Sequence, residues 1–258
     1  MNNISKKSPF ITAYDLLKSA AVILMVIDHL GYYFFPEQEW FRAFGRLCVP
    51  IWFFLIGFSN SRNICYKLFL AASIVEIAQI IFIMPEIFNA LPLNILFTIM
   101  VIRLVIDYFI AKLEKDIGGF LLIIILIAVF NFIIGLIFEY GTLGLILAMF
   151  GYIVRHKEKY LTDHKSFVYI YYFITGGVFI FYQQVIFNFT IIPLLFTISG
   201  VFLINFFLMH KFQRIYRPNI EKYTGKIFGY CIRFTGRKTL DIYIIHVLVF
   251  SLIQKLYF

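Results

Sequence analysis

The sequence predicts an all-α polytopic membrane protein with about nine transmembrane helices (eight to ten), and two observations lead to that fold class. First, 62% of the 258 residues are hydrophobic and only 14% are charged, with a mean hydropathy of +0.88, whereas soluble domains carry about 25% charged residues. Second, the apolar residues come in blocks long enough to cross a bilayer, roughly 17–25 residues each. The short alternating segments of a β-barrel are not visible. These features exclude a soluble domain and a barrel.

Apolar segments bounded by polar or turn-forming residues give the predicted helices. In chain order they are 13–35, 46–60, 66–84, 91–111, 118–137, 141–154, 166–187, 190–209 and 239–257. The second and the sixth are short for a full crossing, so either could be tilted, broken or re-entrant. No internal repeat or linker interrupts the series, and residues 1–258 are therefore treated as a single integral-membrane domain.

The distribution of Lys and Arg predicts the orientation of these helices. If the N-terminus is cytoplasmic, the inner loops and their flanking residues hold 18 of the 23 Lys and Arg residues. Cytoplasmic loops of membrane proteins carry such an excess, so the pattern predicts nine crossings with the N-terminus inside. The same bias explains the net charge of +9. Binding to nucleic acid is not expected, because no basic stripe stands on a soluble module.

The predicted cytoplasmic loop 210–238 holds eight basic residues interleaved with Ile, Phe and Tyr. Its stretch 219–235 could form an interfacial helix that lies on anionic lipid. Alternatively, the loop could be a landing site for a phosphorylated cytosolic ligand.

Two adjacent ionisable residues, Asp28 and His29, lie inside the first segment. Such groups are costly in a bilayer, so they indicate a functional site. A neutral histidine in a poorly solvated cavity is a competent general base. Lys18 lies on the same helix face as His29, about 16 Å away, and Asp15 lies close to that face. Asp28 points elsewhere: it could orient a ring, complete a cavity wall or pair with a neighbouring helix. A purely structural role for His29, as a hydrogen bond between two helices, remains open.

Other candidate residues are spread along the chain. Arg46 begins the second segment on the predicted outer side, where it could bind a ligand or anchor the interface. His246 lies about 11 Å from the inner end of the last segment and His29 about 24 Å from the inner end of the first, so the two need not share one depth. Arg103 and Asp107, four residues apart, are expected to pair.

The cysteines are few and widely spaced, at Cys48, Cys65 and Cys231, and imply neither a metal site nor a disulfide framework.

The chain resembles the TraX family of membrane acyltransferases. The resemblance lies in Asp15-Leu-Leu-Lys18, Asp28-His29, Gly45-Arg46 with Pro50, Asn94-Ile-Leu-Phe-Thr98, Tyr140-Gly141 and Tyr243 with His246. Lys18 and His29 also look like the Arg-x10-His signature of acyltransferase family 3, with Lys in place of Arg. Each motif alone is weak, but their order and spacing are specific. Glu139 stands where the family pattern leads us to expect Asp.

The resemblance implies transfer of an acyl group, usually acetyl, from cytosolic acyl-CoA in a bacterial cytoplasmic membrane. We hypothesise that His29 is the general base, assisted by Asp28. The residues expected to bind CoA or acceptor are Lys18, Asp15, Arg46, Asn94, Tyr140, Tyr243 and His246. Acetyl-CoA is the expected co-substrate and no metal is expected. The acceptor is left open, and the candidates are a pilin N-terminus, a glycan and a lipid.

Two further functions are compatible with the sequence. A proton-coupled transporter or permease could use Asp28, His29, Glu76 and Arg103 as a relay. A scaffold for an envelope complex would tolerate substitutions at His29 and His246.

Overall fold

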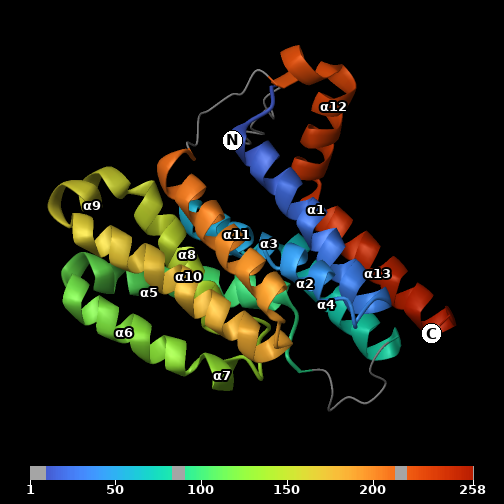
Figure 1. Cartoon of the computed structure of the whole chain (residues 1–258), viewed down its shortest axis with the longest axis horizontal. Helices are drawn as coiled ribbons and strands as arrows, with labels where there is room; N and C mark the ends of the chain where they lie inside the picture. Colours follow the sequence, from blue (N-terminus) through green and yellow to red (C-terminus); the bar gives the residue numbers. More distant parts are fainter. Residues whose placement is uncertain (1–9, 83–90, 213–219, 258) are drawn as a thin grey trace.

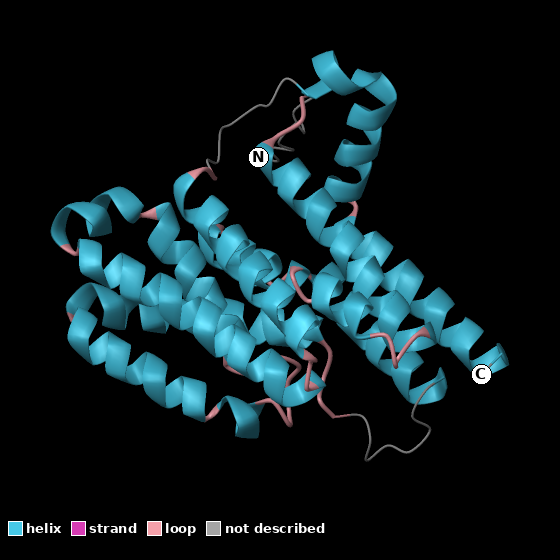
Figure 2. Cartoon of the chain, viewed as in Figure 1, coloured by secondary structure: helices cyan, strands magenta, loops and turns pink. Residues whose placement is uncertain are grey.

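The computed structural model describes residues 10–82, 91–212 and 220–257, and their regular structure is helical (Figure 2). The helices are α1 (Ala13–Phe34), α2 (Glu39–Gly45), α3 (Cys48–Phe58), α4 (Tyr66–Phe82), α5 (Ile95–Lys115), α6 (Ile117–Val129), α7 (Asn131–Ile134), α8 (Leu143–Arg155), α9 (Lys157–Asp163), α10 (Lys165–Phe187), α11 (Ile191–His210), α12 (Ile220–Arg237) and α13 (Thr239–Tyr257). Every predicted segment contains a helix, so the all-α fold class is confirmed.

Four stretches of the described chain are long and apolar enough to cross a membrane. They are Glu39–Phe58, Lys165–Phe187, Ile191–His210 and Thr239–Tyr257. The apolar helices α6 and α8 are shorter, at 13 residues each. Large apolar side chains also lie exposed on the outside of α4, α6 and α11, which suits contact with lipid. A helical membrane protein is therefore supported, while nine crossings and a cytoplasmic N-terminus stay predictions.

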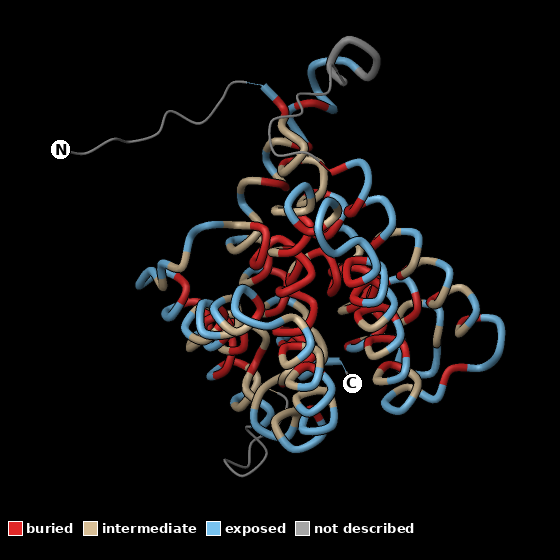
Figure 3. Tube along the Cα trace, turned by 90° about the vertical axis from the view of Figure 1, so that its left-hand side faces the viewer, coloured by how far each residue is buried: buried red, intermediate tan, exposed pale blue. Residues whose placement is uncertain are grey.

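The short helix α3 lies at the centre of the molecule (Figure 1). Helices α1, α4, α12 and α13 form one side of it, and α5 to α11 form the other, with α8 packed directly against α3. Buried residues gather in the interior and exposed residues line the outer helix faces (Figure 3). Almost every residue of α3 is buried, so its uniformly apolar sequence fits its place in the core.

Local sequence signals determine where several helices begin. Thr12 and Asp15 form a capping box at the start of α1, in which each side chain accepts a hydrogen bond from the other residue's backbone N–H. Asn94 caps α5 and Asp116 caps α6 in the same way, through side-chain oxygens.

The ion pair predicted between Arg103 and Asp107 is wrong. Asp107 Oδ1 accepts a hydrogen bond from Arg62 Nε at 2.9 Å, and Arg103 Nη1 donates to the carbonyl of Asn63 at 2.7 Å. The loop between α3 and α4 lies beside this part of α5. It therefore offers closer partners than the next turn of the same helix.

Glycines allow the backbones of α3 and α8 to touch. A Cβ atom on Gly151 would lie 2.1 Å from the carbonyl oxygen of Phe54, and one on Gly57 would lie 1.6 Å from that of Ala148. Small residues permit such close approach between helices in membranes, where packing rather than water exclusion drives association. The core of the protein depends on this contact.

We predict that Gly151→Ala lowers stability by about 1–3 kcal/mol or more, because the added methyl group meets backbone atoms that cannot move aside. Thermal unfolding in detergent measures the loss. The matched control is Gly177→Ala on α10, where an added Cβ has no neighbour within 4 Å. Equal melting temperatures for the two variants would show that the α3–α8 contact is not tight.

Candidate functional site

Two cavities share Tyr243 in their lining. The polar cavity has a volume of about 200 Å³ and is lined by Asp28, His29, Arg42, Arg46, Glu76, Asn94 and Glu139, among others. The apolar cavity, of about 330 Å³, is lined mainly by aliphatic side chains of α1, α3, α4, α5 and α13. Lys18 and Arg103 belong to its lining as well.

His29 and His246 form a hydrogen-bonded pair between α1 and α13. His29 Nδ1 lies 2.6 Å from His246 Nε2, and His246 Nδ1 lies 2.6 Å from the carbonyl oxygen of Ile242. A carbonyl oxygen can only accept, so His246 Nδ1 carries a proton. With both rings neutral, His246 Nε2 then accepts the proton of His29 Nδ1. We therefore assign His29 Nε2 as the unprotonated nitrogen of the pair.

The two histidines meet because α13 runs alongside α1 in the same direction. Thr235 bonds to Ser19 at 2.6 Å between hydroxyl oxygens, His246 bonds to His29, and Ser251 donates to the Tyr33 hydroxyl at 3.1 Å. Helix α13 thus begins beside the third turn of α1 rather than beside its first residue. The sequence places His29 about 24 Å from the inner end of its segment because that distance is counted from the first residues of α1. Those residues extend past the start of α13, so the two distances do not share an origin. The two rings lie at the same level.

The Asp28 carboxylate forms ion pairs with two guanidinium groups. One belongs to Arg42 in α2 and the other to Arg46, the residue that follows α2. Its Oδ2 lies 3.1 Å from Arg42 Nη1 and its Oδ1 lies 3.3 Å from Arg46 Nε. Arg42 Nη1 also donates to the Asp28 carbonyl at 3.0 Å, and Arg46 Nη1 donates to the hydroxyl of Tyr140, just before α8. Asp28 does not orient the His29 ring directly. It pairs with a neighbouring helix, one of the roles left open by the sequence.

Gly45 permits this ion-pair network, because a Cβ atom there would lie 2.3 Å from the Cβ of Asp28. Any larger side chain would push α2 away from α1 and lengthen both contacts of the carboxylate.

Asn94 is engaged in a second polar network at the wall of the polar cavity. Its side-chain nitrogen donates to Glu76 Oε2 at 2.8 Å and to the Ala72 carbonyl at 2.9 Å. Glu139 Oε2 accepts from the backbone N–H of Ile95 at 3.0 Å. These contacts hold the start of α5 against α4 and the turn before α8. The carboxylate oxygens of Glu76 and Glu139 supply acceptors opposite the arginines.

The structure gathers most of the predicted site residues but not all. Asp28, His29, Arg46, Asn94 and Tyr243 line the polar cavity. Tyr140 and His246 reach it through their hydrogen bonds to Arg46 and His29. Lys18 lies in the apolar cavity.

Asp15 lines neither cavity and binds Arg237 instead, with Oδ2 at 2.9 Å from Arg237 Nη2. Its expected role in binding CoA is therefore not reflected in the lining of either cavity.

Arg42 is the member of the site that the sequence did not single out. It falls in the loop between the first two predicted segments. Its spacing of four residues from Arg46, on one face of a helix, was the available signal. Within the described residues, no group of three or more His, Cys, Asp or Glu side chains could hold a metal ion.

The fold and the site define a class of protein: a polytopic helical membrane protein with a histidine pair and a buried ion-pair network between its helices. The chain belongs to the TraX family, because the model of that family, described as TraX protein, matches residues 13–218. It is also similar to the uncharacterized protein RP591 of Rickettsia prowazekii (strain Madrid E), with 30% identity over 148 residues. That match spans 57% of this chain and 58% of the relative. No solved structure matches the chain.

We predict that Asp28→Asn destabilises the protein by about 3–5 kcal/mol, since it leaves two buried guanidinium groups without their counter-charge. Thermal unfolding in detergent measures the loss. Asp107→Asn is the matched control: its carboxylate is 64% exposed in its pair with Arg62, and such pairs contribute about 0–1 kcal/mol. A melting temperature for Asp28→Asn as high as that of the control would contradict the role given to this carboxylate.

Proposed function

We propose that this protein is a membrane-bound acyltransferase that moves an acetyl group from cytosolic acetyl-CoA to an amine or hydroxyl acceptor. The proposed location is a bacterial cytoplasmic membrane, with the N-terminus of the chain in the cytoplasm. Membership of the TraX family supports the reaction class. The excess of basic residues in alternate loops supports the orientation.

The observation that carries the proposal is the histidine pair where the two cavities meet. Ile242 and His246 together fix the tautomer of His29, so that Nε2 is free to accept a proton. An orienting partner behind a general base is the arrangement by which many acyl-transfer enzymes activate a nucleophile. The partner here is a second imidazole, which can share the positive charge that His29 acquires.

The proposed reaction is a direct transfer. His29 Nε2 takes the proton of the acceptor hydroxyl or amine as its oxygen or nitrogen attacks the thioester carbonyl. The tetrahedral intermediate collapses, the carbon–sulfur bond breaks, and the leaving thiolate takes the proton from the His29 imidazolium to give CoA. Arg46 and Tyr243 supply the donors that stabilise the oxyanion. A covalent acyl-histidine would need a separate site for its hydrolysis or transfer and is less favoured.

The apolar cavity is the proposed route for the thioester arm of the donor. Its lining runs from Lys18 on the second turn of α1, and Arg103 on α5, inward to Met25 and Tyr243. Two basic residues at one end suit the phosphates of CoA, while the aliphatic walls suit the pantetheine arm. The acyl carbon would then arrive beside Tyr243, one helical turn from His246 on α13.

The polar cavity is the proposed site of the acceptor. The arginines and carboxylates of its lining supply donors and acceptors for a polar group, and His29 lines the same space. This lining suits an amine or a hydroxyl on a pilin N-terminus, a glycan or a lipid headgroup.

A transport function is the second candidate, favoured by the same two cavities on either side of Tyr243. A solute could pass between them if the Tyr243 ring moved aside, with His29 and Asp28 as proton carriers. Binding of CoA separates the two candidates, because only the acyltransferase requires it.

We predict that His29→Ala abolishes transfer of labelled acetyl groups in reconstituted membranes, with a loss of about 100- to 10,000-fold. His246→Asn should give a smaller loss, because the base remains but its orienting partner is weakened. His210→Ala, at an exposed position on α11, is the control and should keep full activity. Labelling by His29→Ala at the wild-type rate would remove the assignment of the base.

We predict that Ile99→Trp, which fills part of the apolar cavity, raises KM for acetyl-CoA by about tenfold, because excess volume in a packed site costs about 1–3 kcal/mol. It should also weaken the protection that CoA gives against thermal unfolding. Leu104→Trp on the same helix is the matched control, since Leu104 is 70% exposed on the outside of α5. If CoA protects neither the wild type nor the control variant, the transport reading is favoured.

A further inference from the structure

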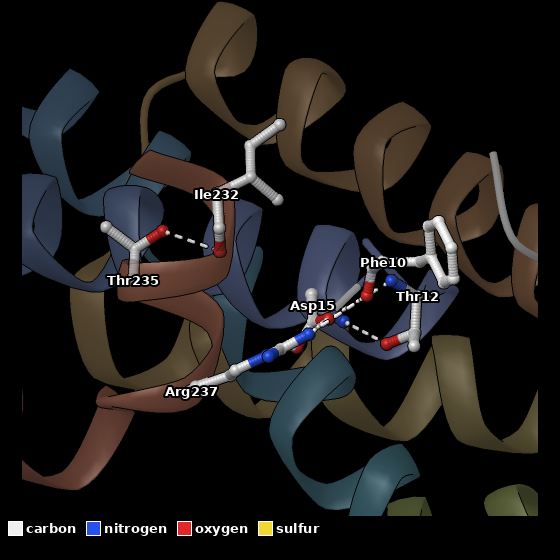
Figure 4. Close-up of polar contacts among 6 residues, drawn as sticks. All are labelled: Phe10, Thr12, Asp15, Ile232, Thr235 and Arg237. Carbon is white, nitrogen blue, oxygen red and sulfur yellow. Dashed lines mark hydrogen bonds and ion pairs between the residues drawn. The ribbon is translucent and has the colours of Figure 1, made fainter. Parts of the chain in front are cut away.

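The inner face of α12 is anchored to the beginning of α1 (Figure 4). Arg237 donates to both Asp15 carboxylate oxygens, at 2.9 and 3.1 Å, and to the carbonyl of Phe10 at 3.0 Å. The hydroxyls of Thr235 and Ser19 lie 2.6 Å apart. A Cβ atom on Gly236 would lie 2.4 Å from the Asp15 carbonyl oxygen. One side of α12 is therefore held in backbone contact with α1.

The opposite side of α12 carries large apolar side chains that are exposed. The exposed fractions are 83% for Ile227, 62% for Tyr230 and 50% for Phe234. At about 100° per residue these three fall within one narrow sector of the helix. Lys226 and Arg233 lie along the edge of this sector. An apolar stripe with a basic edge is the pattern of helices that lie in the headgroup region of a bilayer.

The position of α12 relative to the apolar helices corresponds to the headgroup region of a bilayer. Its last turn lies beside the first two turns of α1, as the contacts of Thr235 and Arg237 show. Helix α13, long and apolar enough to cross a membrane, begins at Thr239, two residues after α12 ends. The outer face of α12 therefore lies where the apolar spans end, at the level of the lipid headgroups.

The positive charge of residues 210–238 indicates that the lipid is anionic. Residues 210–238 contain eight Lys and Arg residues and a single acidic residue, Glu221. Basic segments next to a span are attracted to anionic headgroups, at about 1 kcal/mol for each basic residue near the surface. We infer that the exposed face of α12, comprising Ile227, Tyr230 and Phe234, binds the surface of an anionic bilayer. This inference does not depend on the proposed enzymatic activity.

Binding of α12 to the bilayer would also affect the apolar cavity. Thr239 and Leu240, which follow α12 directly, line the apolar cavity. A bilayer that holds α12 in place also holds these two residues at the entrance of that cavity. Anionic lipid would thus stabilise the arrangement seen here, whatever ligand the cavity takes.

The chain offers its own probe for a test. Cys231 is exposed on α12, Cys65 is exposed elsewhere, and Cys48 is buried. In the full-length Cys65→Ser protein, Cys231 can be labelled with a polarity-sensitive dye. The labelled protein is reconstituted in vesicles of phosphatidylcholine alone, or of phosphatidylcholine and phosphatidylglycerol in equal parts. Lipids carrying a quencher near the headgroup report whether the dye touches the bilayer.

We expect blue-shifted emission and strong quenching in the anionic vesicles, and a loss of both in high salt, which screens the attraction. Lys226→Glu should weaken the preference for anionic lipid by about fivefold, and Phe234→Ser should reduce quenching. The control is Lys67→Glu, an exposed lysine at the start of α4, which should change neither.

Three results would overturn the inference. Dye emission that is the same in neutral and anionic vesicles would show that the exposed face of α12 does not bind anionic lipid. Quenching that depends on protein concentration rather than on lipid would indicate a second copy of the chain. Displacement of the dye signal by inorganic phosphate or CoA would indicate a soluble phosphorylated ligand.

Discussion

The carboxylate of Asp28 is buried in the wall of the polar cavity, and the rest of the site depends on how its charge is balanced. A buried charge is costly unless it is paired with an opposite charge. Arg42 and Arg46 meet both oxygens of this carboxylate, and Gly45 lets α2 approach closely enough for them to do so. Because Arg46 also binds Tyr140, the network ties α1, α2 and the start of α8 together. It thereby fixes the turn of α1 that presents His29.

The histidine pair depends on a different constraint, the alignment of α13 with α1. Contacts at Ser19, His29 and Tyr33 keep the two segments in register along their length. A shift of one turn, about 5.4 Å, would separate the rings completely. The clamp between Asp15 and Arg237 lies at one end of this alignment. Asp15 therefore serves the site by placing α12 and α13, although it lines neither cavity.

The two cavities differ in chemical character. The larger is mainly apolar and carries its basic residues at the end near the start of α1, whereas the smaller is lined by paired charges. They differ as the two substrates of an acyl transfer differ: a long flexible arm on one side and a compact polar group on the other. Tyr243 lines both cavities and lies next to His29. In the proposed reaction, this division would keep the donor and the acceptor apart until they meet at His29.

The sequence alone determined the helical class and the approximate bounds of the helices, and it singled out His29 as a candidate site residue. These follow from local properties: apolar blocks of bilayer length, capping residues such as Thr12, and the cost of an ionisable group inside an apolar segment. Only the tertiary structure decided that His246 lies behind His29, that Arg42 joins Arg46 on Asp28, and that Asp107 pairs with Arg62 rather than Arg103. Each of those contacts joins residues from different helices or loops. The register between such segments is set by packing against the whole fold, which spacing along one helix does not encode.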